Sequence, residues 1–142
     1  MNLLLIGVPG IGKTTLIERI AGALGDRAPY RVSIANLEAV EVAAVRRALD
    51  RRQVVVIDEI GKMELISPDF KAIILETLES DLPTISTIGV SRIAFMEVVR
   101  RRRDVQVIWI TRDNREGLRD RLLEMIRKTF ADGGQMRDQG PA

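Results

Sequence analysis

Residues Gly7 to Thr14 have the types and spacing of a loop that binds phosphate. They read Gly-Val-Pro-Gly-Ile-Gly-Lys-Thr and match the pattern G-x-x-x-x-G-K-S/T. The glycines allow the loop to turn its N–H groups toward a phosphate. Lys13 would reach the β- and γ-phosphates of a triphosphate, and the Thr14 hydroxyl would ligate Mg²⁺. The expected phosphate-binding residues are Gly7, Val8, Pro9, Gly10, Ile11, Gly12, Lys13, Thr14 and Thr15.

Two adjacent acids, Asp58 and Glu59, follow an apolar run that is typical of a strand buried on both faces. Asp58 would hold Mg²⁺ through its water shell. Glu59 would face the other side of the strand end and polarise an attacking water. We therefore predict Mg²⁺ as cofactor, Thr14 and Asp58 as metal-binding residues, and Lys13 and Glu59 as catalytic groups. The nucleotide-binding residues expected in this region are Val54, Val55, Val56, Ile57, Asp58, Glu59, Ile60 and Gly61.

Lys62, Arg92 and the pair Asn114-Arg115 each allow two interpretations. Lys62 would contact phosphate or a second subunit, or it is a surface lysine in a turn. Arg92 would act in catalysis as an arginine finger in cis, or it is an arginine at the start of a helix. Arg115 would stack on a purine base, and Asn114 would contact the base or cap a helix.

The sequence does not favour a guanine-specific switch. Asp58 and Gly61 have the D-x-x-G spacing of small GTPases, but the guanine-reading pattern N/T-K-x-D is absent. Thr111-Arg112-Asp113-Asn114 comes nearest to it and has Asn in place of the purine-reading Asp. We therefore expect broad base specificity.

The composition excludes several classes of protein. The 142 residues fit one domain, and 46% hydrophobic with 30% charged residues is ordinary globular usage. Without Cys no disulfide can form, and without His a zinc site would depend on carboxylates alone. No long apolar run or basic leader is visible, so we expect a soluble cytoplasmic protein with no membrane contact.

The basic residues do not favour a nucleic-acid partner. The net charge is only +2. The run Arg100–Arg103 and a second cluster, Arg46, Arg47, Arg51 and Arg52, lie at the ends of predicted helices, where cations offset the helix dipole. Aromatic residues are too few for a base-stacking surface, at 4%. Nucleoside triphosphates are the expected partners, and the chain is expected to be a monomer or a weak oligomer.

Short apolar runs alternate with longer amphipathic stretches, which is typical of β-α-β units. This predicts an α/β fold with three layers, in which a mainly parallel five-stranded sheet carries helices on both faces. We expect one domain at residues 1–130 and a flexible tail at 131–142. The expected strands are Asn2–Ile6, Tyr30–Ala35, Gln53–Ile57, Thr84–Ile88 and Val105–Ile110. The expected helices are Lys13–Leu24, one capped by Asn36 that runs through Asp50, Pro68–Leu78 with Ser67 as its cap, Ser91–Arg103 and Asn114–Phe130.

The two motifs together resemble a known family. Gly7–Leu16 (GVPGIGKTTL) and Val56–Leu65 (VIDEIGKMEL), followed by Ser67, Phe70, Thr87-Ile88 and Asn114-Arg115, are similar to the nucleoside-triphosphatase family typified by a thermophilic enzyme and a human cancer-related NTPase. The resemblance implies a RecA-like P-loop NTPase fold. It also implies slow Mg²⁺-dependent hydrolysis of ATP, GTP and other NTPs, with binding through Gly7–Thr14 and Val54–Gly61.

The chain departs from that family in one region. Members of the family usually carry additional strands, with a G-F-Y-T-x-E-V-R-like segment, between the first helix and the strand that bears the two acids. Here Gly25 to Arg52 is only 28 residues long and contains no such segment, so we place the deletion around Asp26–Pro29. This departure bears on turnover more than on nucleotide binding.

Three hypotheses follow for function. The first is a Mg²⁺-dependent NTPase of broad base specificity. The second is a nucleotide or nucleoside kinase that uses the same loop, although no inserted lid is visible between Thr87 and Arg103. The third is a nucleotide-binding regulatory module, associated with RNA or not, that has negligible turnover.

Overall fold

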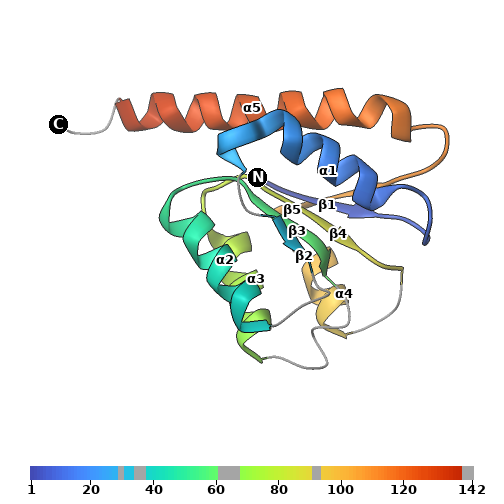
Figure 1. Cartoon of the computed structure of the whole chain (residues 1–142), viewed down its shortest axis with the longest axis horizontal. Helices are drawn as coiled ribbons and strands as arrows, with labels where there is room; N and C mark the ends of the chain where they lie inside the picture. Colours follow the sequence, from blue (N-terminus) through green and yellow to red (C-terminus); the bar gives the residue numbers. More distant parts are fainter. Residues whose placement is uncertain (29–30, 34–37, 61–67, 91–93, 139–142) are drawn as a thin grey trace.

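The computed structural model describes residues 1–28, 31–33, 38–60, 68–90 and 94–138 (Figure 1). Strands and helices alternate along the chain. The strands are β1 (Asn2–Ile6), β2 (Arg31–Ser33), β3 (Val55–Ile60), β4 (Thr84–Ile88) and β5 (Val105–Trp109). The helices are α1 (Lys13–Leu24), α2 (Glu38–Asp50), α3 (Pro68–Glu79), α4 (Ala94–Arg100) and α5 (Arg115–Asp138), with a 3₁₀ turn at Gly25–Arg27.

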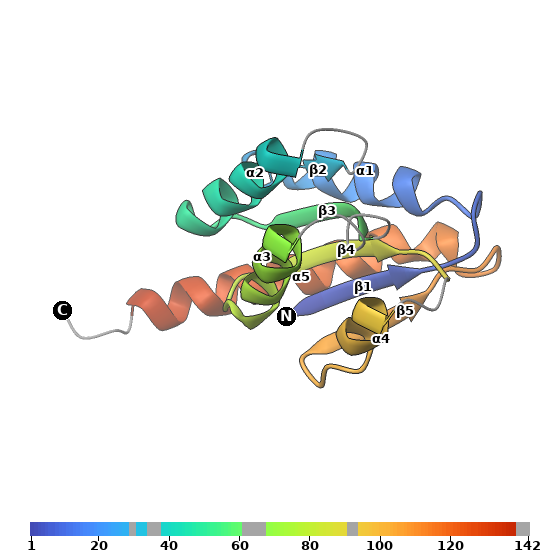
Figure 2. The same ribbon diagram turned by 90° about the horizontal axis from the view of Figure 1, so that it is seen from below.

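The five strands form one parallel sheet in the order β2-β3-β4-β1-β5. Helices α1 and α5 cover one face, and α2, α3 and α4 cover the other (Figures 1 and 2). The predicted three-layer α/β fold with a parallel five-stranded sheet is therefore confirmed. β4 lies between β1 and β3, and all three strands are parallel. Their carboxyl ends therefore lie side by side at the same end of the sheet.

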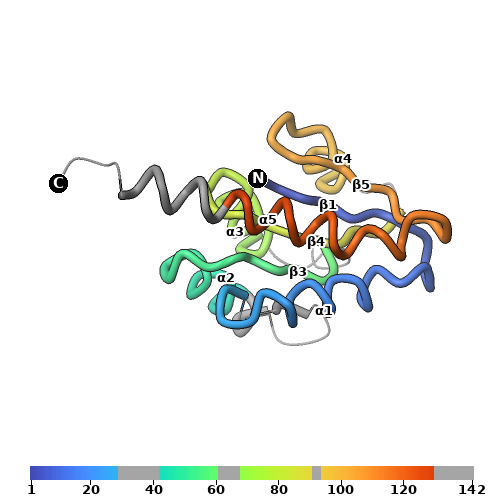
Figure 3. Tube along the Cα trace, turned by 90° about the horizontal axis from the view of Figure 1, so that it is seen from above, coloured from blue at the N-terminus to red at the C-terminus, as the bar shows by residue number. Residues whose placement is uncertain are grey.

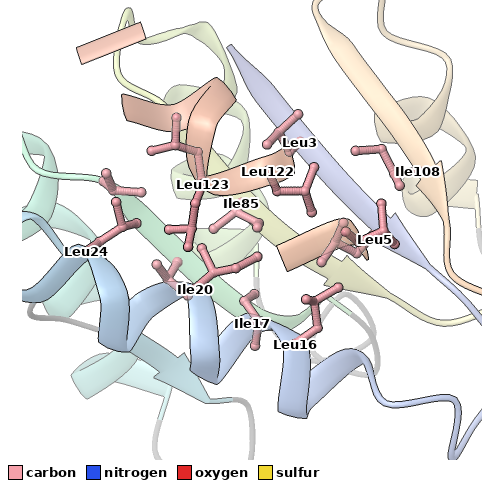
Figure 4. Packing of buried hydrophobic residues seen from close by; sticks show 14 of the residues in the cluster. Leu3, Leu5, Leu16, Ile17, Ile20, Leu24, Ile85, Ile108, Leu122 and Leu123 are labelled. Atoms are coloured by element: carbon pink, nitrogen blue, oxygen red, sulfur yellow. The ribbon is translucent and has the colours of Figure 1, made fainter. Parts of the chain in front are cut away.

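The strands are apolar along their whole length because both faces of the sheet are covered. In β1, Leu3 and Leu5 belong to a core cluster with residues of α1 and α5. Leu4 and Ile6 point the other way, into a second cluster with residues of α2, α3 and α4. Figure 4 shows the first cluster, and Figure 3 shows α1 and α5 side by side above it. Labelled there are Leu16, Ile17, Ile20 and Leu24 of α1, Leu122 and Leu123 of α5, and Leu3, Leu5, Ile85 and Ile108 of the sheet.

Three element ends differ most from the predicted ones. Strand β3 continues through both acids to Ile60, because Ile60 pairs with Ile88 of β4 after a register shift that follows Ile57. Helix α4 ends at Arg100, before the rest of the arginine run. Helix α5 continues to Asp138, through much of the predicted flexible tail. An existing helix gains one hydrogen bond for each added residue, which offsets the cost of Gly133 and Gly134. A domain boundary at residue 130 stays a prediction.

The start of β1 is held by the buried side chain of Asn2. Its amide nitrogen donates to the carbonyl of Leu78 at 2.8 Å and to that of Asp104 at 3.1 Å. Its amide oxygen accepts from the Thr84 hydroxyl at 2.7 Å. Asn2 therefore links β1, the strand that leads into the phosphate loop, to three other segments. These are the end of α3, the start of β4 and the turn before β5.

We predict that Asn2→Leu lowers the free energy of unfolding by at least about 2 kcal/mol, because each buried polar group left without a partner costs about 1–3 kcal/mol. Chemical denaturation measures this change. The control Gln106→Leu, at an exposed position on β5, should stay within about 0.5 kcal/mol of the original chain. Equal stability of the two variants would contradict the role of Asn2.

Candidate active site

The loop between β1 and α1 uses its glycines for two different physical reasons. Gly10 and Gly12 have φ of +83° and +105°, a region that side chains rarely adopt. Gly7 is required for space, because a Cβ there would lie 2.7 Å from Cγ2 of Ile11 and 3.3 Å from the carbonyl oxygen of Ile110. The first residues of α1 are not capped by a side chain, so their N–H groups face the loop, where an anion would bind.

Lys13 is held inside this loop. Its Nζ donates to the carbonyl oxygen of Gly7 at 2.7 Å, and only 9% of the residue is exposed. A buried ammonium at the start of a helix gives the loop a fixed positive charge. The predicted phosphate-binding loop therefore contains the ammonium of Lys13. Most residues of this loop also line the two cavities described below.

Asp58 lies between two hydroxyl groups. The Thr87 hydroxyl donates to Oδ1 of Asp58 at 2.7 Å, and the Thr14 hydroxyl donates to the same atom at 3.4 Å. Asp58 is buried and Thr87 has no exposed surface. The structure thus brings together Thr14 and Asp58, the two residues predicted to bind metal. Both supply oxygen atoms, which are the donors that Mg²⁺ prefers.

The sequence analysis did not identify Thr87 as a site residue. Thr87 is among the residues that carry the family resemblance, but that resemblance assigned it no role. Its local signal is a polar residue near the end of an apolar strand, which Thr84 and Ser86 of the same strand share. Thr87 reaches Asp58 because β4 lies between β1 and β3. Strand order, which local sequence patterns do not determine, thus gives Thr87 its position.

Glu59 faces a different space from Asp58. It is half-buried and lines a cavity of about 460 Å³ beside the phosphate loop. The lining residues are Pro9, Gly10, Gly12, Lys13, Thr14, Thr15, Glu59, Gly89 and Val90. The two neighbouring acids therefore have separate surroundings, since Asp58 is bound by hydroxyl groups and Glu59 borders open space.

The apolar residues in and next to β3 that were predicted to bind nucleotide lie in the hydrophobic core and not at the surface of the site. Val54, Val55, Val56, Ile57 and Ile60 belong to the two core clusters and are at most 1% exposed. They therefore support the two acids and present no surface to a ligand, because both faces of β3 are covered by helices.

Three predicted residues lie outside the described part of the chain. Gly61, Lys62 and Arg92 fall in the ranges 61–67 and 91–93, and so do the expected helix cap Ser67 and the start Ser91 of the fourth expected helix. The contacts predicted for Gly61, Lys62 and Arg92 stay predictions.

Asn114 takes part in the capping of α5. Its Oδ1 accepts from the backbone N–H of Thr111 at 2.8 Å, and the Thr111 hydroxyl accepts from the N–H of Asn114 at 3.2 Å. This reciprocal pair is a capping box in which Asn replaces the usual Glu or Gln. The Nδ2 atom of Asn114 also donates to the carbonyl of Trp109 at 2.7 Å. In this pair Thr111 holds the cap position, so Asn114 is its partner in the turn that leads into α5. Contact of Asn114 with a base stays a prediction.

Arg115 is the first residue of α5 and reaches back to the phosphate loop. Its Nη1 donates to the carbonyl oxygen of Ile11 at 3.4 Å. It also lines a second cavity of about 520 Å³ between α1 and α5. The lining residues are Gly10, Ile11, Gly12, Thr15, Leu16, Arg19, Arg115, Glu116, Arg119 and Asp120.

The arginine runs are engaged in ion pairs. Arg100 binds Glu97 at 3.0 Å and Arg102 binds Asp104 at 2.7 Å. The hydrogen bond from Arg102 lowers the pKa of Asp104. Arg46 binds Glu76 and so joins α2 to α3. These contacts agree with the predicted structural role at helix ends.

A family model described as NTPase matches residues 25–123, a range that includes Asp58, Glu59 and Thr87. The chain belongs to this NTPase family. A nucleoside-triphosphatase THEP1 from Thermotoga maritima is 28% identical over 89% of this chain and 96% of that protein. Another, from Thermofilum pendens, is 37% identical over 84% of this chain and 68% of that protein.

The fold of this NTPase-family chain is also similar to a solved structure. The crystal structure of THEP1 from the hyperthermophile Aquifex aeolicus superposes with a TM-score of 0.75 at 24% identity. The similarity covers 89% of this chain and 99% of that one. None of the helices in the described ranges is long and apolar enough to span a membrane.

This NTPase-family chain is shorter than such relatives. The alignment with the Thermotoga maritima protein runs over 167 positions. Because 89% of the 142 residues is about 126, roughly 41 of these positions have no residue of this chain. This chain is thus shorter than that relative, and the location of the difference between Gly25 and Arg52 stays a prediction.

We predict that Thr87→Val raises the Mg²⁺ concentration needed for half-maximal NTP hydrolysis by about 10–100-fold, the usual effect of removing a group that orients a metal-binding residue. A Mg²⁺ titration of phosphate release measures it. The matched control is Thr77→Val, another buried Thr, whose hydroxyl donates to the carbonyl of Ile73 inside α3. An unchanged Mg²⁺ requirement in Thr87→Val would contradict the orienting role.

Proposed function

We propose that this chain hydrolyses nucleoside 5′-triphosphates to nucleoside diphosphate and phosphate, with Mg²⁺ as cofactor and with broad base specificity. The observation that carries the proposal is the arrangement around the 460 Å³ cavity. The phosphate loop with buried Lys13 forms one side of it, Glu59 borders it, and Asp58 is bound to Thr14 of its wall. The family match and the names of the relatives support the same reaction.

The loop and Lys13 bind the triphosphate. Free backbone N–H groups of the phosphate loop and of the start of α1 would face the phosphate oxygens, and the ammonium of Lys13 would neutralise part of their charge. Pro9 has no N–H to offer, and the N–H of Ile11 is donated to the carbonyl of Val8. Lys13 already forms a hydrogen bond to the Gly7 carbonyl, so little reorganisation is needed when the negative charge arrives. This fixed charge would also stabilise the charge that builds up on the γ-phosphate during transfer.

Thr14 and Asp58 would hold Mg²⁺. Both offer oxygen donors at one point of the site, and the Thr87 hydroxyl donates to the same carboxylate oxygen of Asp58. When bound, Mg²⁺ supplies positive charge to the β- and γ-phosphate oxygens.

Glu59 would activate the attacking water. The oxygen of that water forms a bond to the γ-phosphorus, and the bond from this phosphorus to the β–γ bridging oxygen breaks. The diphosphate leaves with the bridging oxygen, and the Glu59 carboxylate accepts a proton from the water. Glu59 suits this role because it borders the cavity, whereas Asp58 is occupied by two hydroxyl groups. Arg92 would add charge near the γ-phosphate as proposed for an arginine finger.

The nucleoside would lie on the α5 side of the loop. Arg115 lines the 520 Å³ cavity there and is fixed to the loop through the carbonyl of Ile11. Asn114 would act through its pair with Thr111, which fixes the start of α5 and so places Arg115. The described lining offers no residue pair that matches a guanine-specific pattern, which supports broad specificity.

A phosphate-release panel tests the proposed function. ATP, GTP, CTP, UTP and their deoxy forms are compared with and without RNA and with nucleoside and nucleotide acceptors. We expect release without any acceptor, with purine triphosphates within about tenfold of one another, since one hydrogen bond contributes about 0.5–1.5 kcal/mol. Acceptor-dependent transfer would indicate a kinase. Tight binding without release would indicate a regulatory module.

We predict that hydrolysis requires a divalent ion and stops in excess EDTA. Asp58→Asn should need more Mg²⁺ for the same rate, because a neutral amide attracts the cation less than a carboxylate does. Asp69→Asn is the control, at an exposed position in the first turn of α3. Undiminished phosphate release in EDTA would exclude the proposed metal site.

We predict that Glu59→Gln lowers single-turnover hydrolysis by at least about 100-fold, the lower end of the contribution of general base catalysis. ATP affinity should persist or increase slightly, because a negative charge near the γ-phosphate is removed. The control Glu124→Gln, on the exposed side of α5, should change neither quantity. Loss of binding together with turnover would show that Glu59 has a structural or metal-binding role, and unchanged turnover would refute the mechanism.

A further inference from the structure

The cavity between α1 and α5 adjoins the cavity proposed for the γ-phosphate across the phosphate loop. Gly10, Gly12 and Thr15 line both this 520 Å³ cavity and the 460 Å³ cavity that holds Glu59. A ligand seated on the phosphate loop therefore has space on two sides. The volume of the α1–α5 cavity, about 520 Å³, lies within the range of small-molecule sites, about 300–1,000 Å³.

Arginines from two helices line the α1–α5 cavity. On α1, Arg19 lies four residues after Thr15, so both are on the same face and Arg19 is one turn farther from the phosphate loop. On α5, Arg119 lies four residues after Arg115 and extends the wall in the same direction. The cavity thus continues away from the loop between one arginine of α1 and two of α5.

These arginines have few partners within the chain. Arg19 has no hydrogen bond or ion pair to any residue in the described ranges. Among the described residues, the one ion pair of Arg119 is with Asp120, at a long 3.8 Å, and its side chain is 47% exposed. No aromatic residue is among the described residues that line the cavity. Guanidinium groups are therefore the planar surfaces that this lining offers to a flat ligand.

We propose that Arg19 and Arg119 bind the nucleoside part of the triphosphate by stacking their guanidinium groups on the base. The proposal rests on the proposed binding of a triphosphate at the phosphate loop, and it adds two residues that determine how the rest of the nucleotide is held. Arginine stacks on aromatic rings because its guanidinium is planar, delocalised and weakly hydrated. Lysine lacks this planar group.

This mode of binding gives a physical reason for broad base specificity. Every base has an aromatic face, so stacking depends little on the hydrogen-bonding groups at its edge. Purines, which have the larger faces, should bind somewhat more tightly than pyrimidines.

The test compares two ligands, a non-hydrolysable ATP analogue and inorganic tripolyphosphate, by calorimetry with Mg²⁺ present. Tripolyphosphate carries the phosphates without a nucleoside. Arg19→Ala and Arg119→Ala should each weaken binding of the ATP analogue by at least about threefold, and the double variant by about tenfold or more. Binding of tripolyphosphate should change by less than about twofold. Arg121→Ala is the matched control on α5, since Arg121 is exposed and outside the cavity lining.

Arg19→Lys separates stacking from charge. It keeps the positive charge and removes the planar group, so it should weaken binding of the ATP analogue nearly as much as Arg19→Ala does. Full affinity in Arg19→Lys would overturn stacking. Equal losses for both ligands would show that the arginines bind phosphate, and unchanged affinity in the double variant would remove them from the site.

The outcome is independent of turnover. If the chain binds the ATP analogue through Arg19 and Arg119 but releases no phosphate from ATP, the proposed hydrolysis fails and the nucleoside site stands. If ATP is hydrolysed while the double variant keeps full affinity, the nucleoside site fails and the hydrolysis stands. If the ATP analogue does not bind at all, both fail.

Discussion

The buried carboxylate of Asp58 is the constraint on which the site depends. A buried charge is costly unless polar groups satisfy it, and two hydroxyl groups from different elements do so here. Thr87 comes from β4 and Thr14 from α1, at 2.7 and 3.4 Å. The contact with Thr87 exists only because β4 lies between β1 and β3 in the sheet. Pairing of the strands and assembly of the polar cluster are therefore linked.

The two-sided core makes this arrangement rigid. Alternate residues of β1 and β3 enter separate clusters on opposite faces of the sheet, so neither strand can shift by one residue without exchanging its two faces. Asn2 holds the amino end of β1, and Gly7 allows the loop at the other end to approach Ile11 and Ile110 closely. The loop thus begins from a strand that is fixed at both ends.

The phosphate loop separates two environments with different tasks. One side holds the groups proposed for metal binding and water activation, with Asp58 and Glu59 in distinct surroundings. The other side is the cavity between α1 and α5, which both arginine and acidic side chains line. Arg115 links the second side to the loop through the carbonyl of Ile11. Both environments are built from α1, α5, the central strands and their loops, which lie outside the region predicted to be shortened.

Local patterns in the sequence determined the fold class, the phosphate loop and the position of the two acids. Glycine spacing, alternating apolar runs and helix-starting residues act over a few positions, so they can be recognised without knowing the fold. The tertiary structure decided which distant groups meet. Thr87 binds Asp58 from 29 residues away, and Arg115 reaches Ile11 from 104 residues away. Tertiary structure also showed that Asn114 pairs with Thr111 in the turn before α5, and that Arg19 and Arg119 line one cavity. These contacts depend on strand order and helix placement, which result from the packing of the whole chain.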